Sequence, residues 1–434
     1  IYLIKKEMNT TQKKNYALPI AMMIALFFMI SFVTGLQNPM ALIVKSQFEA
    51  SSFMSQLGNA ANFIAYAFMG IPAGLLLEKI GYKKTALLAI IVGFTGVGIQ
   101  FLSGFAESFT VYLIGAFVSG FSMCMLNTVV NPMLNTLGGG GNKGNQLIQV
   151  AGSVNSFGAT IVPVLGGYLI GNAAQPTIKD ANPALFLALG IFALAFIVLY
   201  FVSIPEPHMV KDKAKTKDSH SALSFRHFVL GAAAIFVYVG VEVGIPNILN
   251  LLMTASPENG GLGIETTIAG TIAGTYWFLM LIGRVAGASL AAKVSSKAML
   301  AVASTVGLIF VLLGIFGPLE TKVSMPVFQS DISFGLAEVP IGVMFLVLCG
   351  LCTSVMWGGI FNLAVEGLGK YTATASGIFM VLVCGGGILP LIQGAVADAT
   401  SYLASFWVIF LGMAYLLYYA LIGSKNVNKD IPVE

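Results

Sequence analysis

A series of long apolar windows separated by short breaks constrains this chain more than any other feature. A membrane-spanning helix needs about 20 mostly apolar residues, and twelve windows of about this length or longer follow one another. The windows are 18–44, 52–77, 85–105, 108–137, 146–170, 183–204, 228–253, 267–290, 298–316, 341–368, 372–397 and 402–422. The sequence therefore predicts an all-α membrane protein with twelve transmembrane helices.

The placement of lysine and arginine predicts how these helices are oriented. Of the 22 basic residues, 19 fall on the side that carries both predicted termini, and cytoplasmic loops are the ones enriched in such residues. Both termini are therefore predicted to be cytoplasmic. The predicted organisation is a cytoplasmic N-terminus at 1–17, a six-helix bundle at 18–204, a charged linker at 205–225, a second six-helix bundle at 226–422 and a cytoplasmic tail at 423–434.

The composition excludes several classes of function. Only 9% of the 434 residues are charged, whereas about 25% is usual for a soluble protein. A soluble enzyme, a nucleic-acid-binding protein and a disordered scaffold are all excluded on this ground. The partner that the composition does predict is the lipid bilayer.

Motifs for a metal, a cofactor or a disulfide are not found. Cys124, Cys349, Cys352 and Cys384 all lie in apolar stretches, where cysteine is usually buried and inert. The glycine run at 138–141 lacks the Gly-Lys-Ser/Thr ending of a phosphate-binding loop. We expect no metal, no cofactor, no use of ATP and no enzyme activity.

The two halves of the chain share a pattern of glycine and proline. A Gly-Pro-Gly set with gaps of five and four residues occurs in the fifth and the eleventh predicted span. Parallel six-helix repeats are typical of transporters whose site lies between two halves. The two sets are Gly158, Pro163 and Gly167, and Gly385, Pro390 and Gly394.

The loop after the second span combines a carboxylate, a glycine turn and basic residues. It resembles the signature loop of the major facilitator superfamily, with glutamate where aspartate is usual. The corresponding loop after the eighth span is reduced to Gly283-Arg284 and a later lysine. The residues that we assign to this conformational loop are Gly74, Glu78, Gly81, Lys83, Lys84 and Arg284.

Several further stretches resemble the fucose–galactose–glucose symporter family of this superfamily. They are Gly35-Leu-Gln37-Asn38-Pro39, Asn127-Thr-Val-Val-Asn131-Pro132, Asn155-Ser-Phe-Gly158-Ala, Tyr238-Val-Gly240-Val-Glu242-Val and the glycine-rich region 360–398. The resemblance implies two six-helix bundles in the inner membrane of a bacterium and transport of a sugar. We expect the protein to be a monomer.

The chain also departs from this family at positions that matter. The family's permease has carboxylates, which couple transport to protons, where this chain has Asn38 and Asn127, and a glutamine where it has Gly152. The resemblance therefore implies a sugar transporter without implying a proton symporter.

Glu242 is the carboxylate placed deepest in a predicted span. A charge at the middle of a bilayer costs about 2.5–3.5 kcal/mol on insertion scales, so such a residue usually has a function. We predict that Glu242 faces the cavity, accepts hydrogen bonds from substrate hydroxyls and couples transport to a proton or a sodium ion. The alternative is a carboxylate that bonds a neighbouring helix.

Amides and aromatic rings complete the predicted sugar site. An amide offers a donor and an acceptor to neighbouring hydroxyls, and rings cover the C–H faces of sugars; Trp357 is preferred over Tyr276 and Trp277. Packing between helices is the alternative for each amide. The predicted binding residues are Gln37, Asn38, Asn127, Asn131, Gln149, Asn155, Glu242, Asn247, Trp357 and Asn362.

These observations favour a secondary active transporter that imports a neutral hexose-like sugar by alternating access, coupled through Glu242. A facilitator or a sodium-coupled carrier is the first alternative, because Asn38 and Asn127 replace the family's carboxylates. A membrane sugar sensor that does not transport and a multidrug exporter are further alternatives. The sequence does not identify the sugar.

Overall fold

A computed structural model describes residues 16–37, 40, 43–44, 47–48, 52–170, 177–206, 220–329 and 333–433. Helices make up nearly all of this part of the chain, as the sequence predicts. The long helices are α2 (Ala17–Gly35), α4 (Ser52–Ala106), α5 (Phe109–Leu137), α6 (Gly141–Ile170), α7 (Asn182–Phe201), α8 (Arg226–Thr254), α9 (Thr266–Ala291), α10 (Ser296–Phe316), α11 (Ile341–Thr353), α12 (Met356–Val365), α13 (Thr372–Val381), α14 (Gly385–Ala399) and α15 (Tyr402–Tyr418).

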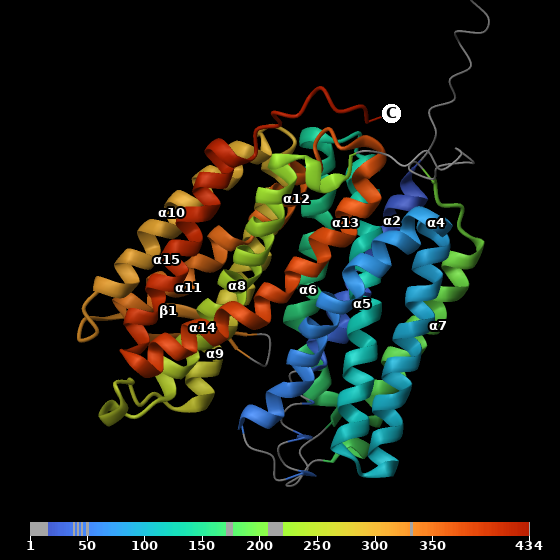
Figure 1. The fold of residues 1–434 in the computed structure, drawn as a ribbon. Helices are drawn as coiled ribbons and strands as arrows, with labels where there is room; N and C mark the ends of the chain where they lie inside the picture. The colour runs from blue at the N-terminus through green and yellow to red at the C-terminus, as the bar shows by residue number, and fades with distance from the viewer. Residues whose placement is uncertain are drawn as a thin grey trace, which may run out of the picture.

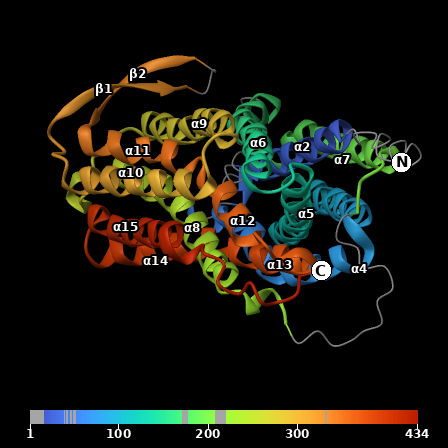
Figure 2. The same ribbon diagram turned by 90° about the horizontal axis from the view of Figure 1, so that it is seen from above.

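These helices form two bundles that follow the order of the chain. Helices α2 to α7 lie together in one half, and α8 to α15 lie in the other (Figures 1 and 2). The predicted linker at 205–225 falls mostly on residues outside the described part of the chain. A short antiparallel hairpin and several short helical turns complete the described elements.

The helices that are long and apolar enough to span a membrane are close in number to the predicted twelve. Ten helices in the described part of the chain are long and apolar enough to span a membrane, and one of these, Ala60–Ala106, has 47 residues. That helix consists of two spans that meet at Gly81. The 30-residue helix α6 is not among the ten. Counting the two parts of α4 separately gives eleven apolar spans in the described residues, and α6 has the length of a twelfth.

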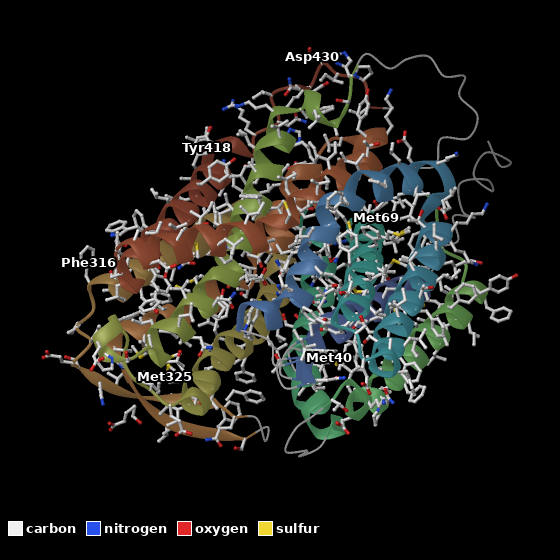
Figure 3. The ribbon with its side chains drawn as sticks, turned by 60° about the horizontal axis from the view of Figure 1, so that its bottom comes forward. Met40, Met69, Phe316, Met325, Tyr418 and Asp430 are labelled. Carbon is white, nitrogen blue, oxygen red and sulfur yellow. The ribbon has the colours of Figure 1, made fainter. Side chains whose placement is uncertain are left out.

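Large apolar side chains cover the outer surface of both bundles. Phe316, at the end of α10, is 72% exposed and lies at the edge of the molecule in Figure 3. Phe201 of α7 and Leu194 of the same helix are also exposed. An apolar surface of this extent is expected where helices face lipid.

The sharp turn within α4 is held by a carboxylate from the segment that follows α7. Gly81 has φ 84°, a conformation that glycine adopts without a steric cost. The backbone N–H groups of Tyr82 and Lys83 then donate to the carboxylate of Glu206, at 2.6 and 3.0 Å. Lys84 is exposed beside them. This carboxylate satisfies N–H groups that a helix start leaves without a partner.

The repeated glycines bring an equivalent pair of helices into close contact in each half. A Cβ atom at Gly158 of α6 would collide with Ser31 of α2, and one at Gly385 of α14 would collide with the carbonyl of Phe236 in α8. Glycine thus permits close approach of the fifth span to the first and of the eleventh to the seventh. Pro163 and Gly167 lie in the segment 163–170, whose side chains are outside the described set.

A β-hairpin forms in the break between the ninth and the tenth predicted span. Strand β1 (Lys322–Phe328) pairs with β2 (Phe334–Pro340), and Ser324 lies opposite Glu338. The hairpin packs on α9 through stacked rings of Phe278 and Phe328, whose centroids are 4.7 Å apart. Alternation of buried and exposed residues in β1 is consistent with a strand that covers one helix.

The two halves meet near the end of the molecule that carries the C-terminus (Figure 1). Gly70 and Gly74 of α4 pack against Gly377 of α13, so closely that a Cβ atom at Gly377 would lie 2.6 Å from the carbonyl oxygen of Gly70. Beside them, Thr374 Oγ1 donates to Glu78 Oε2 at 2.9 Å. Glu78 of the predicted conformational loop therefore contacts the start of a helix in the other half.

Candidate functional site

A cavity of about 220 Å³ lies between the two halves. This volume is slightly below the range of about 300–1,000 Å³ typical of ligand pockets, and it suits a small polar molecule. Both halves supply polar groups and rings to its wall. They include Thr34, Tyr66, Asn127, Gln149, Asn155, Phe27 and Phe63 from the first half and Glu242, Arg284, Ser354, Trp277 and Trp357 from the second.

A larger hollow of about 570 Å³ lies elsewhere, between the hairpin and α9. Its wall is mainly apolar, with Leu262, Ile264 and Leu336 among its residues. It belongs to the second half alone. The smaller cavity is the stronger candidate for a transport site, because it collects polar groups from both halves.

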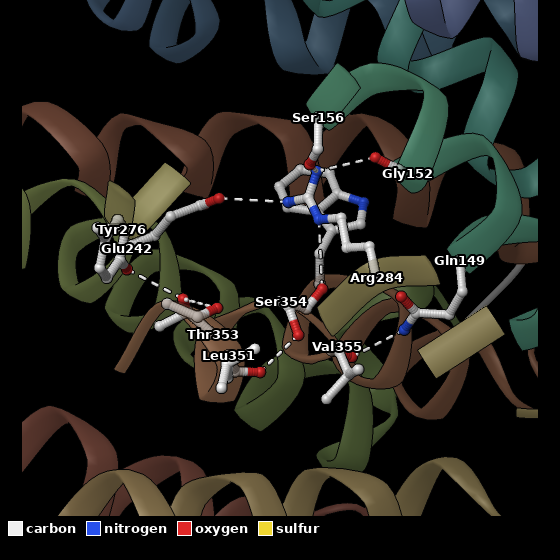
Figure 4. A network of polar contacts seen from close by, with 12 residues as sticks. Gln149, Gly152, Ser156, Glu242, Tyr276, Arg284, Leu351, Thr353, Ser354 and Val355 are labelled. Atoms are coloured by element: carbon white, nitrogen blue, oxygen red, sulfur yellow. Dashed lines mark hydrogen bonds and ion pairs between the residues drawn. The ribbon is translucent and has the colours of Figure 1, made fainter. Parts of the chain in front are cut away.

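Glu242 and Arg284 form an ion pair in the wall of the cavity. The distance from Arg284 Nη2 to Glu242 Oε1 is 3.3 Å, and the two side chains are 10% and 14% exposed. Figure 4 shows the pair with its neighbours. A buried charge is tolerated only when it is paired and hydrogen-bonded. Each partner therefore supplies the charge that the other requires.

Arg284 also connects the two halves of the protein. Its Nη1 donates to the carbonyl of Gly152 at 3.2 Å and to Ser156 Oγ at 2.7 Å, both on α6. Its Nε donates to the carbonyl of Ser354 at 3.3 Å in the second half, as Figure 4 shows. The planar, multidentate guanidinium suits such a junction.

The side chain of Arg284 lies against Gly152 of α6. A Cβ atom built at Gly152 would lie 3.5 Å from Arg284 Cδ, so a long side chain at this position would compete with the arginine for the same volume. A single methyl group at this position would only contact Arg284, whereas a longer side chain would displace it.

The assignment of Arg284 to a conformational loop is wrong. Helix α9 continues to Ala291, and the side chain of Arg284 is buried and lines the cavity. The physical reason is that the carboxylate of Glu242 compensates its charge inside the membrane-spanning bundle. The sequence signal that could have revealed this is a single arginine within an otherwise apolar window.

Two predicted amides line the cavity and are held by the first half. Asn127 Nδ2 donates to the hydroxyl of Tyr66 at 2.8 Å, and Asn155 Nδ2 donates to the carbonyl of Phe27 at 2.9 Å. These bonds fix the orientation of each amide at the wall. Either amide can offer its remaining hydrogen-bonding capacity to a ligand.

Gln149 and Trp357 line the cavity and also bond across the halves. Gln149 Nε2 donates to the carbonyl of Val355 at 2.9 Å, and Trp357 Nε1 donates to Asn131 Oδ1 at 3.0 Å. Asn131 itself is buried and is not part of the lining. A Cβ atom at the neighbouring Gly358 would lie 2.8 Å from Gln149 Nε2. Gln149 and Trp357 thus join the two halves at the wall of the cavity.

Besides Asn131, three further predicted binding residues lie outside the lining of the cavity. Gln37 is 2% exposed; its Oε1 accepts from the hydroxyl of Tyr112 at 3.0 Å. Asn362 is buried and donates to Ser296 Oγ at 2.9 Å. Asn247 is exposed on α8 and is not part of the lining. Amides in membrane helices often serve packing, which accounts for the first two.

Asn38 lies outside the described residues. Of the two other ring candidates, Trp277 lines the cavity, whereas Tyr276 bonds Thr353 Oγ1 at 2.9 Å. Within the described part of the chain, no group of three or more His, Cys, Asp or Glu residues could hold a metal ion.

Comparison with protein families identifies relatives over most of the chain. Residues 23–390 match the sequence model of the Major Facilitator Superfamily. The glucose/galactose transporter of Brucella abortus biovar 1 (strain 9-941) is 31% identical over 427 residues, which cover 96% of this chain and 97% of the relative. The L-fucose-proton symporter of Escherichia coli (strain K12) is 24% identical and covers 89% of each chain.

Solved structures show the same fold. The transporter FucP in the outward conformation superposes with a TM-score of 0.80 at 21% identity, over 95% of this chain and 100% of that chain. The proton:xylose symporter XylE bound to 6-bromo-6-deoxy-D-glucose gives a TM-score of 0.71 at 13% identity, over 95% of this chain and 97% of that chain. The predicted fold class and the predicted family resemblance are both confirmed.

Proposed function

Because this chain belongs to the Major Facilitator Superfamily, we propose that it moves a neutral hexose-like sugar across the membrane by alternating access. The family consists of membrane transporters and not of enzymes. The related proteins are named for glucose and galactose in one case and for L-fucose in another. The proposed substrate class is therefore glucose, galactose or fucose.

The cavity between the halves is the observation that carries this proposal. Its wall combines amides from the first half, such as Asn127 and Asn155, with the indole rings of Trp277 and Trp357 from the second. Amides pair with hydroxyl groups, and rings cover apolar sugar faces. A site that is shared between the halves changes its exposure when the halves rock against each other.

Coupling to an ion is proposed to occur through Glu242. Burial of a carboxyl group favours its protonated form, and the opposite charge of Arg284 at 3.3 Å favours its ionised form. The carboxyl group is thus placed where a change in its surroundings can change its charge. A proton or a sodium ion would serve as the coupling ion.

The orientation in the membrane is proposed from the distribution of lysine and arginine. With both termini in the cytoplasm of a bacterium and the chain in the inner membrane, the end that Gly74, Gly377 and Glu78 close faces the cytoplasm. The cavity then communicates with the opposite side. Import would follow when the contacts at this end separate.

An uncoupled or sodium-coupled carrier is the second candidate. Asn127 lies in the cavity and bonds the neutral hydroxyl of Tyr66, so this position offers no acid for a proton. A carrier that lacks this acid can equilibrate its sugar without accumulating it.

Exchange in reconstituted vesicles tests the substrate class without any assumption about the ion. Proteoliposomes preloaded with unlabelled glucose, galactose or L-fucose are diluted into trace labelled sugar. We expect transient uptake of label with at least one of the three, and none in protein-free vesicles or with mannitol as the preloaded solute. Equal uptake with mannitol or with no sugar would contradict the proposal.

A further inference from the structure

The cavity has a simple inventory of charge. Glu242 and Arg284 are the two charged side chains in the described part of its wall. One is an anion and the other a cation, and they are paired with each other at 3.3 Å. The wall is therefore electrically balanced before any ligand enters. A neutral ligand preserves this balance.

We propose that the Glu242–Arg284 pair selects the substrate by its charge. When either partner is removed, the site should prefer sugars that carry the same charge as the removed side chain. The proposal rests on the proposed function, because it assigns the charge class of the sugar that the same cavity takes. It makes Arg284 a specificity-determining residue, which the sequence does not predict.

The contacts of Arg284 show why Glu242 cannot be removed without consequence. Three of its hydrogen bonds end on neutral oxygens, the carbonyls of Gly152 and Ser354 and the hydroxyl of Ser156. Among the described residues, Glu242 alone provides a negative charge. Without it, the guanidinium remains at the wall as an uncompensated cation. A carboxylate on a ligand is a natural replacement, because arginine binds carboxylates in a planar, bidentate manner.

The same argument applies to Glu242 with the sign reversed. In the described part of the chain, its carboxylate has one ion-pair partner, Arg284. Without the arginine, a buried anion faces the cavity, and an ammonium group on a ligand can compensate it. In the intact protein, a sugar acid would have to compete with Glu242 for Arg284. An amino sugar would have to compete with Arg284 for Glu242.

Three probes of nearly the same shape test this inference in the purified full-length protein. They are D-glucose, D-glucuronate and D-glucosamine, used at a pH where the acid is ionised and the amine protonated. Binding is followed by tryptophan fluorescence, since Trp277 and Trp357 line the cavity. Affinities are expressed as the ratio of the charged probe to glucose, which removes general effects of a substitution.

The expected result is a reciprocal change in preference. In Glu242→Gln and Glu242→Ala, the glucuronate-to-glucose ratio should rise about tenfold or more, equivalent to about 1.4 kcal/mol, and this gain should decline with added salt. In Arg284→Gln, the glucosamine-to-glucose ratio should rise similarly. The double variant Glu242→Gln/Arg284→Gln should lose both gains. Ser153→Ala, a neutral change on α6 outside the lining of the cavity, should leave both ratios as in the wild type.

Ratios that stay at their wild-type values in the single variants would overturn the inference. If the Glu242 variants fail to fold, the glucosamine-to-glucose ratio of Arg284→Gln still tests the inference. Failure of the proposed function is a different result: the wild type would exchange none of the three neutral sugars in vesicles. A gain of glucuronate binding over the wild type would still support the charge inference in that case.

Discussion

Arg284 of α9 donates a 2.7 Å hydrogen bond to the hydroxyl of Ser156 on α6 and thereby joins the two halves beside the cavity. The same guanidinium pairs with Glu242. One residue is thus in contact with the proposed coupling carboxylate and with the opposite half. A change at Glu242 can reach the interface between the halves through this single side chain.

Ser156→Ala should weaken the closed arrangement, because it removes a hydrogen bond to a charged group, worth about 1.5–3 kcal/mol. We expect faster hydrogen–deuterium exchange at the α5–α6 turn and at the start of α10. Both lie at the end of the molecule where the two halves meet. Ser153→Ala is the matched control, since the hydroxyl of Ser153 bonds Gln149 O within α6. Equal exchange in both variants would show that the Arg284–Ser156 bond does not hold the halves.

Glu242→Gln should abolish accumulation of sugar against its gradient while retaining some sugar exchange. The amide keeps the shape of the side chain but cannot carry a titratable charge. The measurement is labelled-sugar uptake with and without an ion gradient, beside counterflow in the same vesicles. Accumulation that is unchanged at every pH would remove Glu242 from the coupling mechanism.

Asn127→Ala should weaken sugar binding by roughly 1–2 kcal/mol, the scale of a lost hydrogen bond whose partner remains unpaired. Gln37→Ala is the control. That glutamine bonds Tyr112 inside the first half, so its loss should lower thermal stability and leave the affinity unchanged. Titration by tryptophan fluorescence and a melting curve separate the two effects. An unaltered affinity in Asn127→Ala would assign that residue to packing.

Gly358→Leu should block transport. A Cβ atom at this position would lie 2.8 Å from Gln149 Nε2 and 3.0 Å from Asn145 Oδ1 of the other half, so leucine should keep the two halves apart at this end. Exchange is expected to fall at least tenfold. Gly190→Leu, at an exposed position of α7 with no atom near its Cβ, should transport normally. Normal exchange in Gly358→Leu would show that this contact is not needed for closure.

The sequence predicts the fold well because its determinants are local. Each span is visible as an apolar segment of sufficient length, and the repeated glycines mark helices that approach closely in both halves. The hairpin at 322–340 is not predicted, because its strands are short and are held on α9 by tertiary contacts such as the stacking of Phe278 on Phe328. Glu206 is likewise missed, since its partners Tyr82 and Lys83 lie more than 120 residues away in the sequence.

The candidate site is predicted only in part, for a different reason. Glu242, Asn127, Gln149, Asn155 and Trp357 line the cavity, as expected. Residue type alone does not determine which face of a helix meets a neighbour, however. Gln37 and Asn362 carry the same amide group but bond adjacent helices. The pairing of Arg284 with Glu242 depends on the rotation of two helices about their axes, which a pattern of residues does not specify.

Gradient-driven uptake by the wild-type protein tests the central claim most directly. Proteoliposomes receive labelled glucose, galactose or L-fucose with an imposed proton gradient, an imposed sodium gradient or none. The account predicts accumulation of one of these sugars above equilibrium with one of the two ions. Equilibration without accumulation under both gradients would contradict coupling through Glu242, and no uptake of any of the three would contradict the assigned substrate class.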